Sequence, residues 1–183
     1  MRQRQKVVPL ASGRVLEVGV GSGLNLAYYD AGRVDAVCGV DPAVELQDRS
    51  RARARASKVP VKLLIGSAED LPFPSASFDT IVTTFTLCSI PDVARGLREL
   101  RRVLRPSGRL LFAEHGLSAD AGVARWQDRL NRPWRFFAGG CNMNRPITSL
   151  LRDGGFAIES VETAYLPGPR VLTYNYWGTA VPA

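Results

Sequence analysis

The chain is poor in cysteine and lacks an apolar run long enough to cross a membrane. Its cysteines, Cys38, Cys88 and Cys141, are odd in number and widely spaced, a pattern that predicts neither a disulfide framework nor a zinc site. We therefore expect no bound metal. No apolar run approaches the roughly 20 residues of a membrane helix, and no apolar stretch follows the basic N-terminus as in a signal peptide. Together these absences predict a cytoplasmic protein.

Histidine is nearly absent too, since His115 is the single one among 183 residues. The length fits one domain. Apolar residues make up 45% of the chain and charged residues 22%, which is typical of a globular domain and argues against disorder. We therefore predict a single domain over residues 1–183.

Acidic residues are outnumbered by basic ones, and the net charge is +7. The arginines gather in two places, at residues 49–58 and 98–105. The second group has helical spacing opposite apolar positions, which predicts a solvated helix face. Aromatic residues do not alternate with the arginines, so nucleic-acid binding through base stacking is not predicted. Peripheral contact with an anionic membrane stays open as an alternative.

A glycine-rich turn follows the first apolar run. Gly19, Gly21 and Gly23 occupy every second position after residues 14–18. Glycine lets the backbone turn sharply and lets a ligand approach closely, and a helix opened by this turn would attract an anion. The dinucleotide pattern Gly-x-Gly-x-x-Gly would need glycine where Leu24 stands. The spacing therefore favours a ligand with an anion smaller than a pyrophosphate.

The second apolar run, residues 36–40, ends in Asp41. An acidic residue about 20 positions beyond the glycines, at the tip of the second strand, commonly holds the ribose hydroxyls of a nucleoside. The two segments together predict a nucleoside site with a carboxylate pocket. S-adenosyl-L-methionine fits this description, because it joins adenosine to an amino acid and carries no phosphate.

Periodicity predicts alternating strands and helices up to the fifth strand, and hence a parallel sheet with right-handed crossovers. Strands are expected at about 14–18, 36–40, 61–65, 79–84, 109–114, 157–164 and 171–180. Helices are expected at about 23–30, 43–57, 92–105 and 146–153, with Asp92 as the N-cap of the third. The last two strands are joined by Pro167-Gly168-Pro169, a link too short for a crossover, so they should pair antiparallel.

Five segments in this order resemble motifs of the class I S-adenosylmethionine-dependent methyltransferases. Residues 17–23 resemble the first motif, residues 39–42 the acidic motif of the second strand, and residues 66–73 the adenine-binding loop. Residues 78–84 and 100–110 resemble the fourth strand and the helix, turn and fifth strand after it. The resemblance implies an α/β fold of the Rossmann-like three-layer type, with a mostly parallel seven-stranded sheet and an antiparallel C-terminal hairpin.

The resemblance also implies which residues hold the cofactor, whose product would be S-adenosyl-L-homocysteine. The glycines should approach the methionine tail, and Glu17 should meet its ammonium directly or through water. Asp41 should accept from the ribose hydroxyls, and the 66–73 loop should face the adenine. Ser67 stands where many relatives carry Asp, and its hydroxyl should accept from the adenine amine. The expected cofactor-binding residues are Glu17, Gly19, Gly21, Asn25, Asp41, Pro42, Ser67, Ala68, Glu69 and Thr83.

A narrower resemblance lies in the second half of the chain. Three regions are similar to thiol S-methyltransferases and their bacterial relatives. They are residues 84–90, Glu114-His115, and Trp134 with residues 140–142. This implies a small, fairly apolar thiol as methyl acceptor, with His115 in substrate binding or proton removal. A hydrogen-bonded histidine at a strand end is the alternative interpretation. Methylation of a lipid headgroup or quinone precursor, and a non-catalytic binding module, are alternative functions; the intact first motif argues against the last.

The segment at about 117–145 is expected to cover the substrate. Its apolar residues recur at roughly helical spacing, which predicts a helix face that either packs on the core or lines the acceptor site; they are Trp126, Leu130, Trp134, Phe136 and Phe137. Few residues precede the first strand, so N-terminal lid helices should be short or absent. The cysteines are expected to behave as small apolar residues, which is favoured over binding of arsenite.

Overall fold

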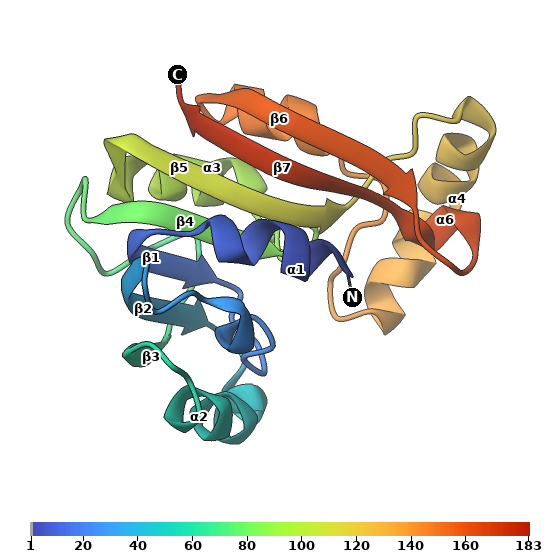
Figure 1. Ribbon diagram of the computed structural model, residues 1–183. Helices are drawn as coiled ribbons and strands as arrows, with labels where there is room; N and C mark the ends of the chain where they lie inside the picture. Colours follow the sequence, from blue (N-terminus) through green and yellow to red (C-terminus); the bar gives the residue numbers. More distant parts are fainter. Residues whose placement is uncertain (1) are drawn as a thin grey trace.

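The computed structural model describes residues 2–183, which form one seven-stranded sheet of order β3-β2-β1-β4-β5-β7-β6 (Figure 1). Strands β3 to β5 of this order run parallel, while β7 is antiparallel to both β5 and β6. The predicted Rossmann-like sheet with an antiparallel C-terminal hairpin is therefore confirmed. The strands are β1 (Gly13–Val18), β2 (Val34–Asp41), β3 (Val61–Ile65), β4 (Phe78–Thr84), β5 (Leu104–His115), β6 (Phe156–Tyr165) and β7 (Tyr174–Pro182).

Helices cover both faces of the sheet, so the fold has three layers. In Figure 1, α1 lies in front of the sheet and α3 behind it. The α-helices are α1 (Arg2–Val7), α2 (Gln47–Arg55), α3 (Val93–Val103), α4 (Ala121–Phe137), α5 (Ile147–Asp153) and α6 (Arg170–Thr173). Three short 3-10 helices are η1 (Val8–Leu10), η2 (Leu26–Tyr28) and η3 (Val44–Leu46).

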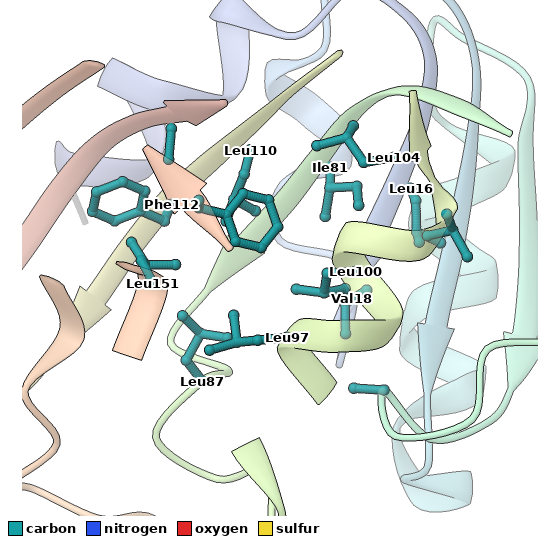
Figure 2. Packing of buried hydrophobic residues seen from close by; sticks show 14 of the residues in the cluster. Leu16, Val18, Ile81, Leu87, Leu97, Leu100, Leu104, Leu110, Phe112 and Leu151 are labelled. Atoms are coloured by element: carbon teal, nitrogen blue, oxygen red, sulfur yellow. The ribbon is translucent and has the colours of Figure 1, made fainter. Parts of the chain in front are cut away.

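Alternating side chains of the central strands supply two separate cores. Ile81, Leu110 and Phe112 face α3 and α5 and pack with Leu97 and Leu151 (Figure 2). Their neighbours Val82, Leu111 and Ala113 point to the other face, where they pack with Val7 and Val8 of the N-terminal segment. Because both faces of these strands are buried, the strands read as continuous apolar runs. The carboxyl ends of β1, β2 and β4 thus meet at one edge of a rigid sheet.

The predicted helix at 23–30 is wrong. The segment forms turns and only the short 3-10 helix η2. Its side chains are committed elsewhere, because Asn25 and Tyr29 are buried and both donate hydrogen bonds to the carboxylate of Glu17. These two hydrogen bonds hold the segment against the sheet in a conformation that is incompatible with a continuous α-helix.

Further boundaries differ from the sequence prediction. Strand β5, expected from about residue 109, begins at Leu104 directly after α3. The strand expected from residue 171 begins at Tyr174, because residues 170–173 form α6, in which Leu172 N–H donates to Pro169 O. The helix expected over 43–57 is divided into η3 and α2. The predicted N-cap of α3 is confirmed, since the Asp92 side chain accepts from Arg95 N–H. The segment expected over 117–145 contains α4 and the loop that leads to α5.

Candidate active site

A cavity of about 440 Å³ lies at the carboxyl ends of β1, β2 and β4. Since β1 pairs with β2 on one side and β4 on the other, the order of strands reverses here, which is where α/β sheets bind ligands. Its walls come from the glycine turn, the end of β2, the 66–68 loop, the loop after β4, and single residues of α1 and of the loop after α4. The lining includes Arg4, Gly19, Gly21, Leu24, Asp41, Pro42, Leu46, Ser67, Ala68, Thr84, Phe85, Thr86, Ser89, Ile90 and Gly139.

Gly19 and Gly21, two of the lining glycines, are required for different reasons. Gly19 has φ 73°, and a Cβ there would lie 2.2 Å from Thr86 Oγ1, so glycine is needed to pack the turn against the loop after β4. Gly21 has φ 50°, and its Cβ would lie 3.7 Å from Leu46 and 3.9 Å from Asp41 Oδ2, which are ordinary contact distances. Its positive φ therefore favours glycine at this lining position beside the Asp41 carboxylate.

Asp41 is the polar centre of this part of the cavity. Its Oδ2 accepts from Gly21 N–H at 2.7 Å and its Oδ1 from Ala43 N–H at 2.8 Å. Both bonds fix the carboxylate while leaving each oxygen able to accept a further hydrogen bond. Pro42 and Ala68 line the same region. The arrangement fits a nucleoside, with ribose hydroxyls at the carboxylate and a base between the two apolar walls.

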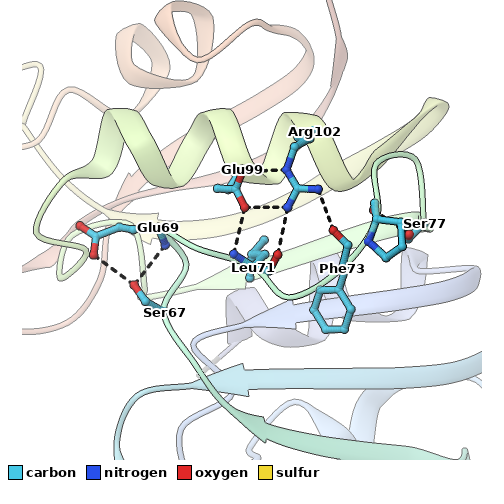
Figure 3. Close-up of polar contacts among 8 residues, drawn as sticks. Ser67, Glu69, Leu71, Phe73, Ser77, Glu99 and Arg102 are labelled. Carbon is cyan, nitrogen blue, oxygen red and sulfur yellow. Dashed lines mark hydrogen bonds and ion pairs between the residues drawn. The ribbon is translucent and has the colours of Figure 1, made fainter.

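The loop that follows β3 is tied to α3 by an ion pair (Figure 3). Glu99 accepts from Leu71 N–H at 2.9 Å, and Arg102 donates to the carbonyls of Leu71 at 2.9 Å and Phe73 at 2.7 Å. The two side chains also bond each other at 2.7 Å. This pair therefore fixes the path of the loop whose first residues line the cavity.

The side chain of Glu69 points away from the cavity. Its carboxylate accepts from Ser67 Oγ at 3.0 Å and from Asp92 N–H at 2.6 Å, which links the loop to the start of α3. The Ser67 hydroxyl also accepts from Glu69 N–H at 3.1 Å. Ser67 lines the cavity with one accepting position left, whereas Glu69 lies outside the lining.

Arg4 of α1 reaches the opposite end of the cavity, a contact that sequence reasoning missed. Its Nη1 donates to Asn25 Oδ1 at 2.7 Å and to Thr84 Oγ1 at 2.6 Å. The guanidinium lies 5.2 Å from the centre of the Phe85 ring, and its Nε is buried with no acceptor among residues 2–183. A cation that is only partly satisfied by the protein therefore faces the cavity. No local signal marks it, because Arg4 precedes every recognisable motif.

Glu17 is buried and does not line the cavity. Its Oε1 accepts from Asn25 Nδ2 at 2.9 Å and its Oε2 from Tyr29 OH at 2.7 Å, with 1% of the residue exposed. Burial raises the pKa of Glu17 to about 7, against the hydrogen bonds from Tyr29 and Asn25 and the charge of Arg4. Glu17 therefore does not reach the cavity for the direct contact with a ligand ammonium that the resemblance implies.

Strand β4 ends at Thr84, as predicted, and Thr84 lines the cavity instead of the predicted site residue Thr83. Thr84 Oγ1 accepts from Arg4 and Asn25, whereas Thr83 is fully buried outside the lining. The next residue, Phe85, has φ 57°. Non-glycine residues in this left-handed region concentrate at functional sites, and Phe85 lines the cavity beside Arg4.

A buried carboxylate on β5 organises the loop after β4. Glu114 Oε2 accepts from Thr86 N–H at 2.9 Å and Leu87 N–H at 3.1 Å. Burial raises the pKa of Glu114 to about 7 despite these backbone bonds. The loop that carries Thr86, Cys88 and Ser89 is thus bonded directly to the strand that ends in His115.

His115 lies outside the cavity lining and beside two cysteines. Its Nε2 is 3.4 Å from Cys141 Sγ, and the ligand atoms of Cys88, His115 and Cys141 all lie within 4.8 Å of one another. Burial opposes the charge of His115, but the hydrogen bond and charge of Cys141 raise the pKa of the imidazole. Their wide spacing predicts isolated, small apolar residues, whereas the structure brings Cys88 and Cys141 together from separate segments.

Several members of the aromatic face of α4 neither pack on the core nor line the cavity, the two alternatives that the sequence left open. Phe136 is 84% exposed, Phe137 82% and Trp126 54%. The helix is held instead by the fully buried Gln127, whose Nε2 donates to the carbonyls of Gly116, Met143 and Val171. An apolar surface is left uncovered, and arginines of the same helix surround it.

None of the helices described over residues 2–183 combines the length and the apolar composition that crossing a membrane requires.

The sequence pattern of the family described as "Methyltransferase domain" matches residues 16–112. Thiol S-methyltransferase TMT1B of Homo sapiens is 31% identical over 173 residues, covering 88% of this chain and 70% of that protein. Phosphatidylethanolamine N-methyltransferase of Cereibacter sphaeroides is 41% identical over 105 residues, or 56% of this chain and 51% of that enzyme.

A solved structure of an S-adenosylmethionine-dependent methyltransferase from Methanosarcina mazei superposes with a TM-score of 0.72. The two share 22% sequence identity, and the match covers 92% of each chain. At that identity the likeness shows the fold alone.

Proposed function

The chain belongs to the methyltransferase domain family, and from this premise we propose that it transfers a methyl group from S-adenosyl-L-methionine to a small molecule, a thiol. The observation that carries the cofactor assignment is Asp41, which lines the cavity and is held there by the N–H of Gly21 in a turn of positive φ. A carboxylate beside an open backbone turn suits a ribose.

Residues at the two ends of the cavity would bind different parts of the cofactor. Asp41 would accept from the ribose hydroxyls, and Pro42 and Ala68 would enclose the adenine. Arg4 would pair with the methionine carboxylate, since a guanidinium and a carboxylate form strong charge-assisted hydrogen bonds. When bound, the cofactor supplies a methyl group already activated on a sulfonium. The protein's task is therefore to align the acceptor with that group and to exclude water.

The thiol acceptor is supported by the relative thiol S-methyltransferase TMT1B of Homo sapiens. It is also supported by the position of the segments that resemble such enzymes. Ser89 of one such region and Gly139, which directly precedes another, line the cavity, and His115 lies beside Cys141. The acceptor would enter where the loop after β4 meets the loop after α4.

Calorimetry with S-adenosyl-L-homocysteine tests the cofactor assignment. We expect one molecule bound per chain by the wild type and no detectable heat for Asp41→Ala. Asp35→Ala, which removes an exposed carboxylate from the same strand, should bind as the wild type does. Absence of binding by the wild type at millimolar ligand would refute the proposal.

The acceptor class is tested by a screen of thiols, amines and phenols with a labelled methyl donor. Labelled thioether is the expected product. Phosphatidylethanolamine belongs in the same screen as the second candidate, because the Cereibacter sphaeroides enzyme is 41% identical over the matched residues and α4 exposes an apolar surface. Transfer to the lipid amine without transfer to any thiol would favour that candidate.

A further inference from the structure

Three soft or borderline ligand atoms converge beside the proposed acceptor site. The Sγ atoms of Cys88 and Cys141 and a ring nitrogen of His115 all lie within 4.8 Å of one another, and Cys141 Sγ is 3.4 Å from His115 Nε2. Around a tetrahedral Zn²⁺, with bonds of about 2.3 Å to sulfur and 2.0–2.1 Å to nitrogen, ligand atoms are roughly 3.4–3.8 Å apart. The three side chains are therefore close enough for one ion to contact all of them after small rotations.

Hydrogen bonds that do not involve the three side chains hold them in place. Asn142 donates to Cys88 O through both its backbone N–H and its Nδ2, each at 2.9 Å. Arg145 donates to the carbonyls of Leu87 and Ile90, on either side of that loop. The loop after β4 and the loop after α4 are thus joined with Cys88 and Cys141 facing His115. A site of this kind is preorganised and does not depend on the ion to fold.

We propose that Cys88, His115 and Cys141 form a binding site for Zn²⁺ whose fourth coordination position takes the sulfur of a thiol. Two thiolates and one imidazole are a donor set that catalytic zinc sites use, with a water or substrate as the fourth ligand. Sulfur ligands disfavour hard cations such as Mg²⁺ and Ca²⁺. This site departs from the expectation that the chain holds no metal.

A buried donor without a partner lies beside the cluster. The indole N–H of Trp134, next to Cys141, is buried and has no hydrogen-bond partner in the described part of the chain. The cationic Arg145 interacts electrostatically with both cysteines. An indole nitrogen is a donor only, so Trp134 would support the sulfur ligand without occupying the fourth position.

The fourth position is assigned to a thiol because of where the cluster lies, and this part rests on the proposed function. Ser89, which follows Cys88, and Gly139, which precedes Cys141 by two residues, both line the cofactor cavity. A thiol that coordinates the ion does so through a sulfur lone pair and releases its proton to solvent, because the metal stabilises the thiolate. The substrate class is thus a small thiol, bound as its thiolate beside the methyl donor.

Metal binding is tested without any methyl donor, so its result is independent of cofactor binding. The full chain, reduced and freed of metal by a chelator, is titrated with Co²⁺ and then Zn²⁺. We expect one ion per chain, with thiolate-to-cobalt charge-transfer bands and intense visible bands of tetrahedral Co²⁺ that Zn²⁺ abolishes. Absence of these bands in the wild type would overturn the proposal, whatever the variants do.

Variants assign the ligands. Cys88→Ser, Cys141→Ser and His115→Ala should each bind Zn²⁺ at least about 100-fold more weakly. Cys38→Ser is the matched control, because Cys38 is a partly exposed free cysteine on β2, away from the cluster, and it should bind as the wild type does. Equal affinity of Cys38→Ser and Cys141→Ser would contradict the site, as would a Cys88–Cys141 disulfide that persists in reducing buffer.

The fourth position is tested by adding benzyl mercaptan to the Co²⁺-loaded chain. Its sulfur should shift the visible and charge-transfer bands, whereas benzyl alcohol at the same concentration should leave them unchanged. Bands that form as expected but do not respond to the thiol would retain the metal site and remove the thiol from it. If S-adenosyl-L-homocysteine fails to bind while these spectra appear, the proposed function fails and the metal site stands.

Discussion

Arg4 and Thr84 are 80 residues apart in the sequence and meet at the cavity wall, where Arg4 Nη1 donates to Thr84 Oγ1 at 2.6 Å. The same nitrogen donates to Asn25, which in turn donates to the buried Glu17. The N-terminal helix therefore does more than cover the sheet, because it supplies the cation at the end of the cavity opposite Asp41.

We expect Arg4→Met to weaken the binding of S-adenosyl-L-homocysteine roughly 10- to 100-fold, the range of a hydrogen bond between charged groups. Calorimetry measures this directly. Lys6→Met is the control, since it removes the same charge from the same helix at an exposed pair with Glu162. Binding of 5′-methylthioadenosine, which lacks the amino-acid tail, should be equal in all three proteins; an equal loss for both ligands in Arg4→Met would contradict the assigned contact.

Most of the sheet could be predicted from the sequence because its strands are buried on both faces. Residues such as Ile81 and Val82 face different cores and are both fully buried, so the apolar run itself marks the strand. The segment after Gly23 could not be predicted in this way. Its conformation is decided by the bonds from Asn25 and Tyr29 to Glu17, and local propensity carries no information on those contacts.

In the candidate site, too, some contacts follow from local sequence motifs and others arise only from packing. Gly21 and Asp41 lie in two local motifs separated by a predictable strand, and their contact follows from the parallel pairing of β1 and β2. Arg4 reaches the cavity only because α1 packs across the sheet. His115 and Cys141 are 26 residues apart, and the packing of α4 and its following loop brings them together. Spacing in sequence cannot indicate such a cluster.

The ion pair of Glu99 and Arg102 is expected to control the loop that bounds the adenine end of the cavity. Arg102→Ala removes the bonds to two loop carbonyls and should lower the free energy of unfolding by about 1–3 kcal/mol, while weakening S-adenosyl-L-homocysteine binding. Urea unfolding and calorimetry measure the two effects. Arg98→Ala, at an exposed position of the same helix, should leave both unchanged, and matching losses in the two variants would sink the interpretation.

The exposed aromatic surface of α4 is expected to contact anionic lipid. Phe136 and Phe137 are more than 80% exposed, and Arg132 and Arg135 lie on the same helix. Burial of two phenylalanines together with attraction of arginines to lipid phosphate describes an interfacial helix.

Flotation with vesicles that contain phosphatidylglycerol checks this contact. The wild type should float with the vesicles at low salt, and the double variant Phe136→Ser/Phe137→Ser should bind at least about 10-fold more weakly. Val44→Ser/Ile65→Ser removes two other exposed apolar residues and should float as the wild type does. A wild type that stays at the bottom of the gradient would show that α4 has another role.

The buried Glu17 is expected to make stability depend on pH. Burial raises its pKa from 4.5 to about 7 in the folded protein. Below pH 4.5 the group is protonated in both states; between pH 4.5 and 7 the unfolded chain loses the proton while the folded chain retains it, so stability falls as pH rises. The loss is on the order of 3 kcal/mol and is complete above pH 7.

Urea unfolding between pH 4.5 and 8 should therefore show that the stability of Glu17→Gln rises relative to that of the wild type as pH increases. Glu114, whose pKa is also raised to about 7, leaves a residual slope in both proteins and cancels in their difference. Glu159→Gln, at an exposed carboxylate of β6, should run parallel to the wild type, and a parallel curve for Glu17→Gln would mean that the folded protein holds this carboxylate ionised.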